Sequence, residues 1–202
     1  MFDAAARRLI DPPLNWLGAR LAAISVSANT VTIVGFLVGL SALPLLAYGR
    51  YDLALIAILA NRFSDGLDGA VARANGPTDF GGYLDIVCDF VFYATVVFGF
   101  AVGAPDHAVP AAFLVVSFMG TGTTFLAFAA VASKHKMTTA SRGTKSLYYI
   151  GGLTEGTETI AFFVAMCLWP QAFPILAWVF GGLCWLTTAS RVAMAYRAFG
   201  RR

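Results

Sequence analysis

Long apolar stretches, separated by short polar connections, make up most of the sequence. Six of them contain roughly 20 mainly apolar residues, which is the length that a helix needs to cross the hydrocarbon core of a bilayer. These stretches are residues 31–49, 53–73, 80–103, 108–132, 147–168 and 172–196. No internal repeat and no second domain interrupts the pattern. The sequence therefore predicts an all-α integral membrane protein with six transmembrane helices.

The first 30 residues differ from the rest because they are too polar to span a membrane. Pro12 and Pro13 can open a helix, and the apolar positions that follow recur at helical spacing: Leu14, Leu17, Leu21 and Ile24. We expect an amphipathic helix that lies on the cytoplasmic surface, with a solvated tail as the alternative, and Asn29 as the cap of the first spanning helix. The expected division is a juxtamembrane helix over 1–29 and a six-helix transmembrane domain over 30–202.

Composition excludes the soluble classes of protein. Of the 202 residues, 58% are apolar and 12% are charged, whereas soluble domains contain roughly 45–50% apolar residues, glycine included, and about 25% charged ones. A soluble domain of this length could not bury so much apolar surface, and a disordered chain would not contain it. The cysteines fall in apolar runs without metal-ligand spacing, so we interpret them as packing residues: Cys88, Cys167 and Cys184.

The basic residues predict the orientation of the helices. Only Arg50 lies on one side of the predicted spans, and Arg62 lies within a span. The other 12 of the 14 basic residues lie on the opposite side: Arg7, Arg8, Arg20, Arg73, Lys134, Lys136, Arg142, Lys145, Arg191, Arg197, Arg201 and Arg202. By the positive-inside rule, this asymmetry predicts an inner-membrane protein with both termini on the cytoplasmic side. We expect the active site inferred below to face the same side.

Acidic residues lie where an ordinary membrane protein would not carry them. Six of the 11 fall inside predicted spans: Asp65, Asp68, Asp85, Asp89, Glu155 and Glu158. A carboxylate in a bilayer costs several kcal/mol, so each needs a compensating partner. The four aspartates lie roughly 8 to 14 Å from the connection at 74–79, on two antiparallel helices, so they should face one another. Facing carboxylates would repel unless cations bridged them, and oxygen ligands suit Mg²⁺, with Mn²⁺ as a substitute.

Glycines accompany the aspartates and would let a backbone or a flat ligand approach closely. They are Gly66, Gly69, Gly81 and Gly82. The alternative interpretation is a purely structural network, in which the acids pair with Arg62 and Arg73. Four acids against two bases would leave that network unbalanced, so we favour a metal site, in which Arg73 could bind a phosphate.

The spacing of these residues resembles the signature of the CDP-alcohol phosphotransferase family. All eight fixed positions of that signature match over 25 residues: Asp65, Asp68, Gly69, Ala72, Arg73, Gly81, Asp85 and Asp89. Six spans behind a surface helix also resemble the family. One departure is Ala28-Asn29, where the family often has Pro-Asn.

The resemblance implies transfer of a phosphatidyl-type group from a CDP-linked lipid, expected to be CDP-diacylglycerol, to an alcohol, with release of CMP. It implies two divalent ions, Mg²⁺ or Mn²⁺, which neutralise the diphosphate. The implied metal ligands are Asp65, Asp68, Asp85 and Asp89, and Asp89 is also the implied base for the acceptor hydroxyl. The expected CDP-lipid contacts are Asn29, Thr32, Gly69, Ala72, Arg73 and Gly81. A homodimer among membrane lipids is implied as well, and no nucleic acid partner is expected.

The acceptor is less well defined. Basic residues near the cytoplasmic side suit either a phosphorylated polyol, such as glycerol phosphate or inositol phosphate, or anionic headgroups: Lys134, Arg142, Lys145 and Arg191. Family members with phosphorylated acceptors tend to carry a base on the fifth span, but here that span carries Glu155 and Glu158. Two acids on one helix face could bind an ammonium or several hydroxyls. We therefore expect an unphosphorylated or amine-bearing alcohol, with the phosphorylated polyol as the alternative.

Two other classes of function fit parts of the pattern. A cation-coupled transporter would carry acids near the bilayer midplane and symmetry between the two halves, and the sequence has neither. An intramembrane prenyltransferase would also hold Mg²⁺ against a diphosphate. It should lack the glycine–arginine spacing found here, and it usually needs more spans.

Overall fold

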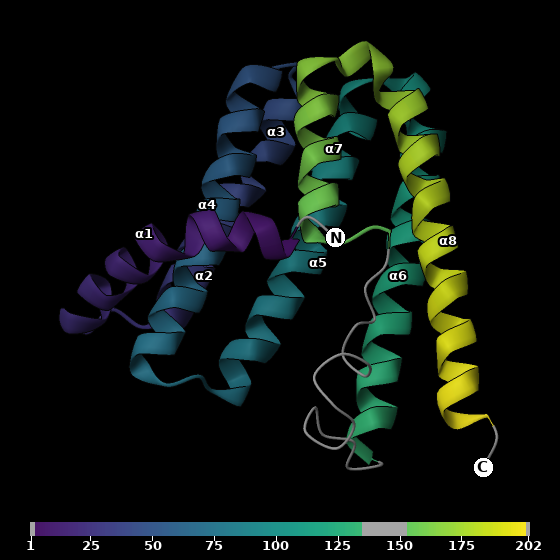
Figure 1. The fold of residues 1–202 in the computed structure, drawn as a ribbon. Coiled ribbons are helices and arrows are strands. Elements are labelled where there is room, and N and C mark those ends of the chain that lie inside the picture. The colour runs from purple at the N-terminus through teal and green to yellow at the C-terminus, as the bar shows by residue number, and fades with distance from the viewer. Residues whose placement is uncertain (1–2, 135–152, 201–202) are drawn as a thin grey trace.

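The computed structural model of the chain describes residues 3–134 and 153–200. Every regular element in these two ranges is helical, as the apolar pattern predicts (Figure 1). The α-helices are α1 (Asp3–Ala23), α2 (Ala28–Leu40), α3 (Ala42–Ala47), α4 (Tyr51–Asn75), α5 (Asp79–Gly103), α6 (Ala108–Lys134), α7 (Gly156–Leu168) and α8 (Phe173–Phe199). Two short 3₁₀ turns, η1 (Pro105–His107) and η3 (Pro170–Ala172), precede α6 and α8.

Within the described residues, four helical segments are long and apolar enough to cross a membrane: Ala28–Ala47, Asp79–Gly103, Pro105–Lys134 and Pro170–Phe199. A further apolar helix, α7, has 13 residues, or about 20 Å of rise. The 25 residues of α4 suffice in length, but from Arg62 onward it carries two arginines and two aspartates. A multi-pass membrane protein is confirmed, whereas the predicted count of six spans is not. Residues 147–152 of the predicted fifth span lie outside the described residues.

The first predicted span is divided into two helices, α2 and α3, which meet at Ser41. Pro44 has no backbone N–H, so an uninterrupted helix would leave the carbonyl of Leu40 without its hydrogen bond. The hydroxyl of Ser41 donates to the carbonyl of Val38 at 2.6 Å and so satisfies one carbonyl at the break. The break is therefore a consequence of one proline.

The cap predicted for this span is wrong by two residues. Ser27 caps α2, because its backbone is extended (φ −82°, ψ 150°) and its hydroxyl accepts the N–H of Thr30 at 3.1 Å. That is the geometry an N-cap requires. Asn29 already lies in the first turn of α2.

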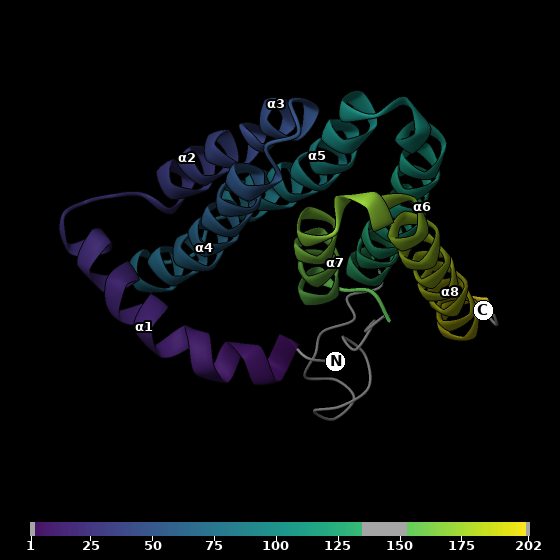
Figure 2. The same ribbon diagram turned by 90° about the horizontal axis from the view of Figure 1, so that it is seen from above.

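Helix α1 crosses α4 at a steep angle (Figures 1 and 2). It begins at Asp3, so Pro12 and Pro13 lie inside it and do not open it. Its apolar stripe is partly covered by protein: Leu14 is 5% exposed and packs against Leu67 and Ala70 of α4, with Leu17 and Leu21 beside it. Close approach depends on Gly18, because a Cβ there would lie 2.7 Å from the Cβ of Ala70.

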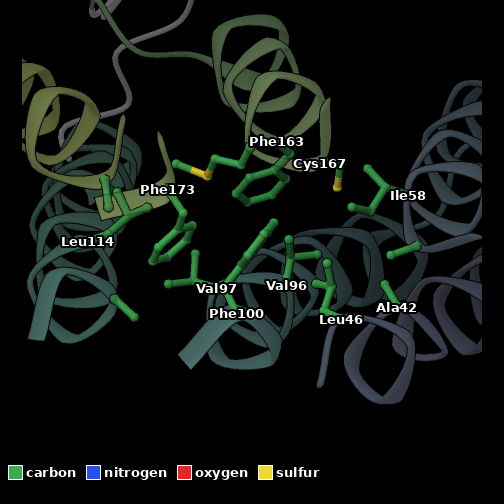
Figure 3. Close-up of a cluster of buried hydrophobic side chains, with 14 of the residues drawn as sticks. Ala42, Leu46, Ile58, Val96, Val97, Phe100, Leu114, Phe163, Cys167 and Phe173 are labelled. Atoms are coloured by element: carbon green, nitrogen blue, oxygen red, sulfur yellow. The ribbon is translucent and has the colours of Figure 1, made fainter. Parts of the chain in front are cut away.

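The apolar core gathers in one half of the molecule, around α3, α5, α7 and the start of α8 (Figure 3). The rings of Phe100 and Phe173 stack with centroids 4.5 Å apart. The first half of α4 contributes Ala54 and Ile58, and the second half of α5 contributes Val96, Val97 and Phe100. Because the two helices are antiparallel, their other halves, which carry the aspartates, lie together at the opposite end.

Candidate active site

The segment between α4 and α5 orients the aspartates. Gly76 ends α4 with φ +93°, a conformation that favours glycine. Thr78 then caps α5, and its hydroxyl accepts the N–H of Gly81 at 3.0 Å. Helix α2 packs against both α4 and α5, and side chains from all three helices line one small pocket. The residues that line it are Thr32, Gly35, Phe36, Asn61, Arg62, Asp65, Asp68, Asp85, Cys88 and Asp89.

Three of the four predicted metal ligands meet in this aspartate pocket. Asp65, Asp85 and Asp89 each offer a carboxylate oxygen within 4.8 Å of the other two. All three are partly buried, and an all-oxygen donor set suits Mg²⁺ or Mn²⁺. The free space between the side chains is about 10 Å³, which is room for one water-sized body. The residues present therefore fit a divalent cation.

The fourth predicted ligand, Asp68, lies in the same pocket, and a neighbouring helix holds its carboxylate. The hydroxyl of Thr32 on α2 donates to Oδ2 of Asp68 at 2.6 Å. Asp68 is only 6% exposed. Thr32 was expected to contact the CDP-lipid, and the structure places it against a candidate metal ligand.

An arginine that was given no functional role lies in the centre of the aspartate pocket. Nη2 of Arg62 donates to Oδ1 of Asp89 at 2.7 Å, and Nη1 lies 3.6 Å from Oδ2 of Asp65. Arg62 precedes Asp65 by three residues, so the helical spacing could have indicated the pair. Of the alternative network, in which the acids pair with Arg62 and Arg73, the structure therefore contains the ion pairs of Arg62.

Arg73 lies in the last turn of α4 and contacts α1. Its Nε and Nη2 donate to Oδ1 of Asn15 at 3.2 and 2.8 Å. A Cβ on Gly69 would lie 3.4 Å from Nη1 of Arg73, so Gly69 and Arg73 share a face of α4. Ala72 immediately precedes Arg73 on the same helix. At the start of α5, a Cβ on Gly81 would lie 3.1 Å from Oδ1 of Asn29. The expected CDP-lipid residues therefore fall into two groups, one beside α1 and one between α2 and α5.

A larger cavity of about 140 Å³ lies among α5, α6, α7 and α8. Its polar lining includes Thr121, Thr154, Glu155, Thr159 and Arg191. Arg191 is 8% exposed, and its Nη1 donates to the carbonyl of Thr121 at 2.9 Å. A buried arginine in the wall of a cavity is a strong candidate contact for an anion.

Tyr93 connects this cavity with the aspartate pocket. Its ring lines the cavity, while its hydroxyl accepts from Nη1 of Arg62 at 3.1 Å and donates to Oδ2 of Asp89 at 3.4 Å. A ligand in the cavity could thus contact Tyr93, a side chain that is hydrogen-bonded to Asp89.

We expected the two glutamates to lie together inside a spanning helix. The structure instead places both at the N-terminus of α7. Helix α7 begins at Gly156, so Glu155 is its N-cap. The side chain of Glu155 accepts the N–H of Glu158, and Oε2 of Glu158 accepts the N–H of Glu155 at 3.1 Å. This reciprocal capping box satisfies two backbone donors, and the negative charges suit the N-terminus of the helix.

The remaining predicted residues are scattered. Lys134 is exposed at the end of α6. Arg142 and Lys145 lie outside the described residues. Cys167 and Cys184 are buried packing residues, as expected, but Cys88 lines the aspartate pocket. Its position three residues after Asp85 places it on the same face of α5, which sequence reasoning overlooked.

The same fold is found in solved structures of a phosphatidylinositol phosphate synthase (PgsA1) of Mycobacterium tuberculosis. The structure with CDP-DAG bound has a TM-score of 0.67 at 21% identity, and the match covers 91% of this chain and 93% of that one. The complex with manganese and citrate has a TM-score of 0.68 at 22% identity, with 91% and 88% covered.

Sequence relatives extend over nearly the whole chain. The inner membrane protein YnjF of Escherichia coli (strain K12) is 49% identical over 97% of this chain and 96% of its own length. An archaetidylinositol phosphate synthase of Pyrococcus horikoshii is 31% identical over 92% of each chain. The family model for CDP-alcohol phosphatidyltransferase matches residues 25–192. With its signature aspartates gathered in one pocket, the chain belongs to the CDP-alcohol phosphatidyltransferases, the membrane enzymes that synthesise phospholipids with divalent metal ions.

Proposed function

We propose that this enzyme transfers a phosphatidyl-type group from a CDP-linked lipid to a phosphorylated polyol, with an inositol phosphate as the first candidate, and releases CMP. The observation that carries the proposal is the buried Arg191 in the wall of the 140 Å³ cavity. An arginine presents planar paired donors that match a phosphate, and partial burial strengthens that interaction. The names of the archaeal relative and of the solved neighbour support the same class of acceptor.

This proposal replaces the unphosphorylated or amine-bearing acceptor that the sequence favoured. That expectation depended on Glu155 and Glu158 facing the cavity as a pair. The capping box already engages both carboxylates with backbone N–H groups at the start of α7. Glu155, Thr154 and Thr159 also line the cavity, and their oxygens suit the hydroxyls of a polyol.

On the donor side, we assign the metal to Asp65, Asp85 and Asp89, with Asp68 beside them. When bound there, Mg²⁺ or Mn²⁺ would neutralise the diphosphate of the CDP-lipid, and the family resemblance favours two ions. We assign donor recognition to Asn29, Gly69, Ala72, Arg73 and Gly81, with Thr32 holding Asp68.

The chemical step uses Asp89 as the base. The acceptor hydroxyl loses its proton to the Asp89 carboxylate. Its oxygen forms a bond to the phosphorus that carries the lipid, and the bond from that phosphorus to the CMP oxygen breaks. Tyr93, which lines the cavity and donates to Oδ2 of Asp89, would orient this base toward the acceptor. An in-line displacement puts the attacking oxygen and the leaving CMP on opposite sides of the phosphorus, and an acceptor cavity beside the donor pocket is compatible with that arrangement.

We further propose that α4 and α7 complete a six-helix domain over 30–202, behind the juxtamembrane helix of 1–29. The charged second half of α4 would be covered by α1, α2 and α5 and so would not face lipid. Both termini and the aspartate pocket would face the cytoplasm, and a homodimer is expected from the family. Cysteine labelling at Gly49 and Gly200 from either side of sealed vesicles tests this orientation, because the two positions should label from opposite sides.

The test of the acceptor is CMP release by the purified enzyme in detergent with CDP-diacylglycerol and Mn²⁺. Inositol phosphate and glycerol phosphate are compared with inositol, serine and ethanolamine. The expected result is turnover with a phosphorylated polyol and little with the others. Arg191→Gln should raise the KM of that acceptor and leave the KM of the CDP-lipid unchanged, while Arg197→Gln, exposed on the same helix, should change neither. Preferred turnover of an unphosphorylated or amine-bearing alcohol would overturn the proposal.

A further inference from the structure

We propose that Arg62 is a positioning residue that serves as a resident cation of the aspartate pocket. It holds Asp65 and Asp89 in place before a metal ion arrives, and it fixes which oxygen of Asp89 is left for the acceptor. This inference rests on the proposed metal role of the aspartates. No part of the family signature includes this arginine.

All three nitrogens of the Arg62 guanidinium donate hydrogen bonds. An arginine has five N–H groups in a fixed planar arrangement. Nε and Nη2 both donate to Oδ1 of Asn61, at 2.9 and 2.6 Å. Nη2 also donates to Asp89, and Nη1 meets the Tyr93 hydroxyl and the carboxylate of Asp65. Four of these contacts are hydrogen bonds and the contact with Asp65 is an ion pair at 3.6 Å; together they restrict the orientation of the guanidinium.

Neighbouring helices hold that orientation. Nδ2 of Asn61 donates to the carbonyl of Gly35 on α2 at 2.9 Å, so its oxygen must face Arg62. Asn61 is 4% exposed. The carbon at the centre of the guanidinium lies 4.8 Å from the ring centroid of Phe92, at a distance typical of cation–π contacts. Arg62 is thus fixed by α2, α4 and α5 at once.

The consequence for Asp89 is a division between its two oxygens. Oδ1 is bound to Arg62 at 2.7 Å, while Oδ2 lies 3.4 Å from the hydroxyl of Tyr93, a residue that lines the larger cavity. Without Arg62, the Asp89 side chain could rotate and present either oxygen to either side. A base that must meet an acceptor hydroxyl works best in one orientation, so we expect Arg62 to affect turnover through Asp89.

The consequence for stability is that a divalent metal ion could replace the positive charge that Arg62 supplies. Three partly buried carboxylates within 4.8 Å repel one another, and Arg62 compensates two of them. Removing one partner of a buried ion pair is strongly destabilising, because the remaining charge is left uncompensated. A divalent ion at the same carboxylates would supply the missing charge. Loss of Arg62 should therefore make the stability of the protein depend on metal.

The experiment compares melting temperatures in detergent, with EDTA or with Mn²⁺, for the full-length wild type and Arg62→Gln. In EDTA, Arg62→Gln should melt about 5–15 °C below the wild type, and saturating Mn²⁺ should restore most of that difference. The control is Arg191→Gln, which also removes a buried arginine but lies outside the aspartate pocket. Its loss of stability should be the same with and without Mn²⁺.

A second measurement is independent of both stability and turnover. Binding of Mn²⁺, followed by the electron paramagnetic resonance signal of the free ion, should be at least as tight in Arg62→Gln as in the wild type, because a competing positive charge is gone. Arg62→Lys, which keeps the charge but not the fork of donors, should keep most of the metal-free stability. Its kcat should still fall at least about 10-fold, with the KM of the CDP-lipid unchanged.

Three outcomes would overturn the inference. Equal losses of melting temperature in EDTA and in Mn²⁺ would make Arg62 a packing residue. Weaker Mn²⁺ binding by Arg62→Gln would contradict the role of Arg62 as a resident cation whose charge the metal replaces. No Mn²⁺ binding by the wild type would remove the metal role of the aspartates itself, and with it the proposed donor chemistry, while leaving the acceptor assignment to the turnover assay. If Arg62→Gln does not fold in either condition, Arg62→Lys decides through its kcat and its metal-free melting temperature.

Discussion

The hydroxyl of Tyr93 lies 3.4 Å from Oδ2 of Asp89 and donates to it, so a side chain in the wall of the larger cavity is hydrogen-bonded to a carboxylate of the aspartate pocket. Tyr93→Phe removes this hydroxyl and keeps the ring packing against Phe118 and Phe163. We expect kcat to fall about 2–10-fold, as for the loss of one hydrogen bond, with the KM of the CDP-lipid unchanged. Steady-state CMP release measures both constants. An unchanged kcat would show that the hydroxyl does not orient Asp89.

Metal removal should abolish transfer. Excess EDTA followed by dialysis should leave no CMP release, and Mn²⁺ or Mg²⁺ should restore it. Asp65→Asn and Asp85→Asn should each weaken Mn²⁺ binding, because each removes a charged oxygen ligand. Asp79→Asn is the matched control, since Asp79 is exposed at the start of α5 and lies outside the cluster. Full turnover after chelation would contradict the metal assignment.

Asp89→Asn separates catalysis from binding. The amide keeps an oxygen that can accept from Arg62, but it cannot take up the proton of the acceptor. We expect kcat to fall by about 10²–10⁴-fold, the range typical of a general base, while the affinity for CDP-lipid is retained. A variant that keeps more than about a tenth of the wild-type rate would contradict the role of Asp89.

Glu158→Ala distinguishes a capping role from acceptor binding. The variant loses one half of the capping box at the start of α7, which should cost about 0.5–2 kcal/mol of stability. In a chain of this length that corresponds to a melting temperature lower by about 1–8 °C. The KM of the acceptor should not change. A large increase in that KM would place Glu158 in the acceptor site as well.

Much of the site could be predicted because its signal is local in sequence. Asp65 and Asp68 share a turn of one helix, Asp85 and Asp89 share a turn of the next, and the short connection between them brings the pairs to one depth. Three of these carboxylates do meet. The role of Arg62 could not be predicted in the same way, because it depends on the distance between α4 and α5 and on side-chain torsions.

Helix ends were harder to predict than helix interiors, for two different reasons. Ser27 and Asn29 are both good N-caps by type, and only the backbone conformation decides between them. At α7 the capping signal was present, because two acids three residues apart precede an apolar run. It was missed because the apolar run seemed to begin earlier, at residue 147, and this placed both glutamates inside a helix.

The two ends of the α4–α5 pair have different roles: one packs in the apolar core and the other lines the aspartate pocket. Ala54, Ile58, Val96 and Phe100 pack in the apolar half, whereas Arg62, Asp65, Asp85 and Asp89 lie in the polar half. The candidate metal ligands are therefore not among the residues that pack the apolar core. The proposed acceptor contacts Thr154, Glu155 and Arg191 line a different cavity from the aspartates, so on this assignment protein engineers could alter headgroup selectivity there without changing the metal ligands.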